Sequence, residues 1–63
     1  MMKNNIEIYK RAKFDILQSK NIEQLKVSKF YMDLAKDLLT FEQWNDLFKN
    51  YELKNRLLTE NIN

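Results

Sequence analysis

The first run of apolar side chains along the chain has the spacing of an amphipathic helix. Ile8, Ala12 and Ile16 recur every fourth residue, so they fall on one arc of a helix that advances about 100° per residue. Asn4 precedes this run and has a side chain suited to capping a helix start. The pattern predicts a helix over about residues 5–18.

A second helix is predicted over about residues 22–39, with Asn21 as its N-cap and Gln24 at the third helical position. Its polar side chains cover only a narrow arc. The apolar ones occupy most of the remaining circumference: Leu25, Val27, Phe30, Tyr31, Met32, Leu34, Ala35, Leu38 and Leu39. A helix that is apolar over so much of its surface needs cover from two sides. It packs against both neighbouring helices, or against one neighbour and another chain.

The segment LLTFEQW marks the next helix boundary without glycine or proline. Thr40 and Gln43 have the spacing of a capping box, and Leu39 and Trp44 have the spacing of a hydrophobic staple across it. All four residues indicate the same start, so a third helix is predicted over about residues 41–58.

The third helix carries apolar residues on two opposite sides. One stripe comprises Trp44, Leu47, Phe48, Tyr51 and Leu58. Leu53 and Leu57 lie across from it, which leaves two possibilities. The helix breaks near Asn50 and a short fourth helix turns these leucines inward, or one long helix displays them. Residues 60–63 are expected to fray.

The fold class follows from these segments and from what the chain lacks. It has no glycine and no proline, on which tight hairpin turns depend. We therefore predict an all-α, compact unit of three helices, possibly four, within one domain over residues 1–63, with the second helix central. The large side chains assigned to its core are Phe30, Leu34, Trp44, Phe48 and Tyr51.

Composition argues against an enzyme. The chain has no cysteine and no histidine, so thiolate or imidazole metal sites and the familiar nucleophilic dyads are excluded. The acidic pairs Asp33/Asp37 and Glu42/Asp46 lie on polar helix faces beside lysines, as solvated charges do. We predict no catalytic residues, no metal, no cofactor and no small-molecule substrate.

Apolar side chains that one small core cannot hold indicate a protein-interaction surface. Phe14 stands among charged residues of the first helix, beside Lys10 and Arg11, while Leu53 and Leu57 lie off the main stripe of the third. These five residues form the candidate partner surface. We predict a small regulator, inhibitor or adaptor that binds another protein and also self-associates as a symmetric homodimer.

Charge supports a second hypothesis, a helical accessory protein that binds DNA. Residues 1–29 hold seven basic and three acidic side chains, whereas residues 30–63 hold four and six. The basic side chains of the first part could bind phosphates: Lys3, Lys10, Arg11, Lys13, Lys20, Lys26 and Lys29. Against this, arginine occurs only twice and acids are interspersed, which makes a weak phosphate-binding surface.

The sequence also indicates where the protein acts and comes from. No charge-free stretch approaches the ~20 apolar residues of a membrane span, and no apolar signal-peptide core follows the first lysine. We therefore expect a cytoplasmic protein without a membrane partner. Nine lysines against two arginines, with eight asparagines, are typical of an AT-rich genome such as that of a phage or other mobile element.

Overall fold

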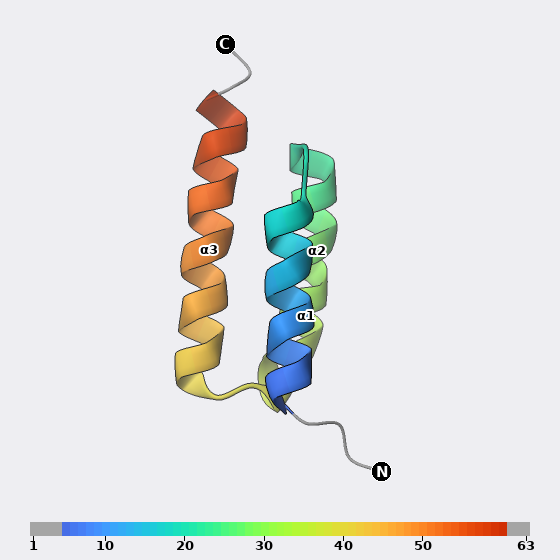
Figure 1. Cartoon of the computed structure of the whole chain (residues 1–63), viewed down its shortest axis with the longest axis vertical. Coiled ribbons are helices and arrows are strands. Elements are labelled where there is room, and N and C mark those ends of the chain that lie inside the picture. The colour runs from blue at the N-terminus through green and yellow to red at the C-terminus, as the bar shows by residue number, and fades with distance from the viewer. Residues whose placement is uncertain (1–4, 61–63) are drawn as a thin grey trace.

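A computed structural model describes residues 5–60 and shows three helices packed side by side. They are α1 (Asn5–Gln18), α2 (Ile22–Ala35) and α3 (Phe41–Glu60), with a short 3-10 turn, η1 (Lys36–Leu38), after α2. The chain runs up, down and up again in an elongated unit of 46 × 19 × 14 Å (Figure 1). Each helix contacts the other two. The predicted all-α fold, with the second helix packed against both neighbours, is confirmed.

The corner between α1 and α2 is closed by side-chain caps. The Asn21 carboxamide oxygen accepts a hydrogen bond from the Gln24 amide at 2.8 Å, as its position predicts. The Gln24 side chain reaches back and accepts from the amide of Lys20, also at 2.8 Å. These bonds satisfy backbone donors that a helix start otherwise leaves unpaired.

The corner before α3 contains the predicted capping box. The Thr40 hydroxyl accepts from the Gln43 amide at 3.1 Å, and the Gln43 side chain accepts from the Thr40 amide at 2.9 Å. Leu39 and Trp44, on either side of the cap, both pack against the core. The last turn before this corner tightens into η1, and Leu39 is extended, so α2 itself ends at Ala35.

The core is one cluster of small and medium side chains contributed by all three helices. Its members are Ala12, Ile16, Leu25, Met32 and Leu47. Beside it, the hydroxyls of Ser19 and Ser28 lie 3.1 Å apart, and both residues are buried. The Ser19 hydroxyl donates to the carbonyl of Asp15, so this polar pair is satisfied inside the α1–α2 contact.

The third helix does not break at Asn50. The Asn50 side chain donates to the carbonyl of Asp46 one turn earlier, at 2.7 Å, and the helix continues to Glu60. It rises beyond the α1–α2 corner (Figure 1). Of the two possibilities open in the sequence, the structure has the long helix. Of residues 60–63, for which fraying is predicted, Glu60 is still part of α3, and residues 61–63 lie outside the described part.

The predicted core is wrong at three positions. Phe30 is 64% exposed and Leu34 is 66% exposed, both on the outer side of α2. The inward row of α2 is instead Leu25, Ser28, Met32 and Ala35, in which serine and alanine allow close helix approach. Trp44 and Tyr51 are partly buried and pack against the core, as expected. Phe48, the third wrong position, is 37% exposed and lies outside the core, beside the rings of Trp44 and Tyr51.

A candidate protein-interaction face

The outer side of α2 and η1 carries a stripe of uncovered apolar side chains. Val27, Phe30, Leu34 and Leu38 are spaced three, four and four residues apart, so they share one helix face. Their exposed fractions are 70%, 64%, 66% and 59%. We call these four residues the α2 stripe. It is a second apolar face on a helix whose first face already packs on α1 and α3.

A shallow groove between α1 and α2 runs beside the stripe. Its part near the α1–α2 corner has a volume of about 410 Å³, and Val27 of the stripe lines it. A smaller hollow of about 230 Å³ near the other end is lined by Ile8, Tyr31, Ala35 and two stripe residues, Leu34 and Leu38. Tyr31 lines both hollows, and none of the lining residues comes from α3. Three of the four stripe residues line these hollows, so the stripe and the groove adjoin each other along α2 and form one face.

Charged side chains border this face. Glu7 and Arg11 of α1 line a third hollow along the groove, again with Tyr31 and Ile8. Lys26 lies at the start of the stripe and Asp37 at its end, and both are exposed. Neither has an ion-pair partner among residues 5–60. The face thus has an apolar centre with charges at its edge.

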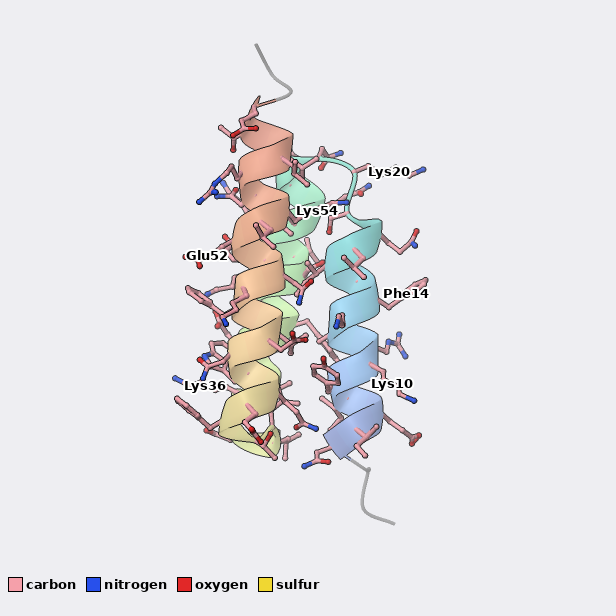
Figure 2. All side chains as sticks on the ribbon, turned by 60° about the vertical axis from the view of Figure 1, so that its left-hand side comes forward. Lys10, Phe14, Lys20, Lys36, Glu52 and Lys54 are labelled. Atoms are coloured by element: carbon pink, nitrogen blue, oxygen red, sulfur yellow. The ribbon has the colours of Figure 1, made fainter. Side chains whose placement is uncertain are left out.

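The structure places the five residues predicted as a partner surface on two separate helices. Phe14 is 61% exposed and, with Lys10, projects from α1 on the side away from α3 (Figure 2). Leu53 and Leu57 are each 57% exposed on α3. Arg11, one turn before Asp15, borders the α1–α2 groove instead. The five residues are exposed, as predicted, and do not form a single patch.

The α2 stripe was missed as a surface because the sequence shows only that α2 is broadly apolar. That breadth was itself the signal. A helix in a three-helix unit can bury one row of side chains against its neighbours, and the excess row remains outside. Of the two rows available, the one with smaller side chains became the inner one.

The basic residues proposed for phosphate binding do not act as one group. Lys13 pairs with Asp46 at 3.2 Å, and Lys29 pairs with Asp33 at 3.0 Å within one turn of α2. The Lys29 ammonium also lies 5.8 Å from the centre of the Tyr51 ring. Lys10, Arg11, Lys20 and Lys26 are exposed, and Lys3 lies outside the described residues. Two of the six described cations are thus already engaged by carboxylates.

A small polar cluster joins α1 to α3. The Tyr9 hydroxyl donates a hydrogen bond to the Asp46 carboxylate, and the Lys13 ammonium lies 3.2 Å from the same oxygen. Lys13 also donates to the Tyr9 hydroxyl at 3.3 Å. The bond from Tyr9, followed by the ammonium of Lys13, lowers the pKa of Asp46 below its usual value, against partial desolvation. The same two partners, Tyr9 first, raise the pKa of Lys13.

This cluster predicts a pH-dependent effect for Asp46→Asn. Because the folded pKa of Asp46 lies below its unfolded value, its stabilising contribution is complete above the unfolded pKa and is lost as pH falls through the folded one. We expect the substitution to lower the Tm by about 2–5 °C at pH 7 and by clearly less at pH 3. Thermal melts followed by circular dichroism measure both differences.

The matched control is Glu52→Gln, an exposed carboxylate on the same helix. It should change the Tm by less than about 1 °C at either pH, since surface substitutions away from specific contacts are nearly neutral. Equal effects of Asp46→Asn at pH 7 and pH 3 would show that the carboxylate charge does not stabilise the α1–α3 contact.

Comparison with protein-family models, characterised proteins and solved structures finds no match to this chain. Within residues 5–60, no helix combines the length and apolar character needed to cross a bilayer. In the same part of the chain, no three acidic side chains gather as a metal site would require.

Proposed function

We propose that this chain is a non-enzymatic protein-interaction module whose main docking surface is the α2 stripe with the adjoining groove. One observation supports this above all: four large apolar side chains on one helix face are each more than half exposed. Contiguous apolar surface of this kind is rare on monomeric soluble proteins and usually marks an interface. A charged border around an apolar centre is the usual anatomy of such a site.

The mechanism would be occlusion, in which the module covers a surface of its partner as a regulator, inhibitor or adaptor. Helical modules of this kind bind by laying an apolar face, read at intervals of three and four residues, against a complementary groove or helix. The spacing of Val27, Phe30, Leu34 and Leu38 meets that requirement. Phe14, Leu53 and Leu57 offer further exposed apolar contacts on α1 and α3.

Nucleic-acid binding has less support, because Lys13 and Lys29 are paired with carboxylates and the remaining cations do not share one helix face. Action in the cytoplasm and an origin in a phage or mobile element stay predictions of the sequence.

The test compares two phenylalanine-to-aspartate variants that differ only in position. Phe30 lies in the α2 stripe, whereas Phe41 is 79% exposed at the start of α3 and outside it. Affinity-tagged chains are incubated with nuclease-treated host lysate, and retained proteins are identified by mass spectrometry. We expect the wild-type chain and Phe41→Asp to retain the same proteins in comparable amounts. Phe30→Asp should lose at least about 90% of them, as loss of an interface anchor does.

Circular dichroism of each variant checks that the helices remain formed. Retention of one and the same protein set by wild type, Phe30→Asp and Phe41→Asp would contradict the α2 stripe as docking surface. If Phe14→Asp alone lost the set, the interaction would be placed on the outer side of α1.

A further inference from the structure

We infer that the occupant of the α2 stripe is a second copy of this chain, with the two α2 helices antiparallel about a two-fold axis near Met32. This inference rests on the proposed function, since it takes the α2 stripe as a docking surface. Beyond that function, it identifies the occupant of the stripe as a second copy and the relative direction of the two α2 helices as antiparallel.

The first support is the arrangement of apolar residues along the stripe. Val27 and Leu38 are its outer members and Phe30 and Leu34 its inner ones. Both pairs are centred close to Met32, on the opposite side of the helix from the buried Met32 side chain. In an antiparallel pair, Phe30 therefore packs against the partner's Leu34, and Val27 against the partner's Leu38. An interface about a two-fold axis requires such a self-complementary surface.

The second support is the charge at the two ends. Lys26, Asp33 and Asp37 are spaced seven and four residues apart, so they lie on one flank of the stripe. Antiparallel pairing sets Lys26 opposite the partner's Asp37, twice in each dimer. In a parallel pair the two copies of this flank would lie on opposite sides of the seam, and Lys26 and the partner's Asp37 would be about 16 Å apart along the helix axis, so their charges could not pair. Within the described chain neither Lys26 nor Asp37 has another ion-pair partner.

The size of the chain favours the same conclusion. A domain of this size buries only about 60% of the surface that its unfolded chain exposes, less than a larger domain does, and self-association is one way of covering more. The four residues of the α2 stripe are far fewer than the roughly 20–30 residues per partner of a standard interface. We therefore expect a dimer that forms at micromolar concentration and dissociates on dilution.

Cross-linking tests the direction of pairing, because the chain has no cysteine of its own. Lys26→Cys and Asp37→Cys are made as separate variants and treated with a short bis-maleimide reagent, alone and mixed. Antiparallel pairing predicts a cross-linked dimer in the mixture only, since the two copies of one position then lie about 16 Å apart along the helix axis. In a parallel pair positions 26 and 37 of different copies stay about 16 Å apart along the axis. A mixture that gives no more cross-linked dimer than the single variants would therefore overturn the inference.

Charge reversal gives a second measurement, by sedimentation equilibrium of the full chain. Lys26→Asp should weaken the dimer about tenfold. Adding Asp37→Lys in the same chain should restore it, because both crossed pairs are then opposite in charge again. Phe30→Asp should weaken the dimer by about a hundredfold or more, and Phe41→Asp should leave it unchanged. Failure of the double reversal to restore association would contradict the crossed charge pairs.

The two proposals can fail separately. A chain that is strictly monomeric at 100 µM, yet binds another protein in a way that depends on Phe30, would overturn the second copy as occupant and leave the proposed function standing. If Phe30→Asp affects neither self-association nor binding of any other protein, both proposals fail.

Discussion

Replacing Leu47 by alanine is expected to remove a large share of the stability of this protein. Leu47 is the one residue of α3 that is completely buried, and it belongs to the cluster formed with α1 and α2. Truncating a buried leucine costs about 2–5 kcal/mol, because apolar contact is lost and a cavity remains. A domain of this length has a total stability of only about 3–9 kcal/mol. We expect a Tm lowered by about 10–25 °C.

Leu53→Ala is the matched control, since it makes the same change six residues further along the same helix. Leu53 is more than half exposed, so its truncation should cost less than about 0.5 kcal/mol. Urea unfolding followed by circular dichroism, at one protein concentration, compares the two variants. Similar unfolding midpoints for Leu47→Ala and Leu53→Ala would mean that the three helices do not share the core described above.

The second large effect is expected from Ala12→Leu. Ala12 is fully buried in the core cluster, where α1 faces the other helices. Three further carbon atoms at that position force α1 away from its neighbours or push side chains out of their preferred rotamers. Overpacking of this kind costs about 1–3 kcal/mol. We expect a Tm lowered by about 5–15 °C, although leucine is nearly as good a helix former as alanine.

Lys10→Leu adds the same side chain to the exposed side of α1 and serves as control (Figure 2). Its Tm should stay within about 2 °C of wild type. The two variants separate the effect of volume in the core from that of added apolarity. If Ala12→Leu is as stable as Lys10→Leu, the core around Ala12 has a cavity large enough for the leucine side chain, and close packing of α1 is contradicted.

Much of the fold could be predicted from the sequence because its boundaries depend on local contacts. Thr40 bonds to Gln43 and Asn21 to Gln24, three residues apart in both cases, so the pattern is visible without tertiary contacts. The same holds for the row Ile8, Ala12 and Ile16, which is buried as its spacing predicts. The absence of glycine and proline argues against tight β-hairpin turns and so favours an all-helical fold.

The candidate site could be predicted only in part. Phe14, Leu53 and Leu57 are exposed, as expected from their places off the main apolar rows. The α2 stripe was not recognised as surface, because Phe30 and Leu34 are as apolar as any core residue. A large apolar side chain is not buried merely because it is large. The small core between three helices has room for only one apolar row of α2.

The sequence by itself determined three helical segments, the caps that begin the second and third of them, and an excess of apolar surface on the second. Tertiary structure decided which side of α2 turned inward, and that α3 continued through Asn50. The physical reason is that local capping involves residues a few positions apart, whereas burial depends on simultaneous contact with two other helices. Small residues such as Ser28 and Ala35 permit that close contact, so their row lies inside and Phe30 and Leu34 lie outside.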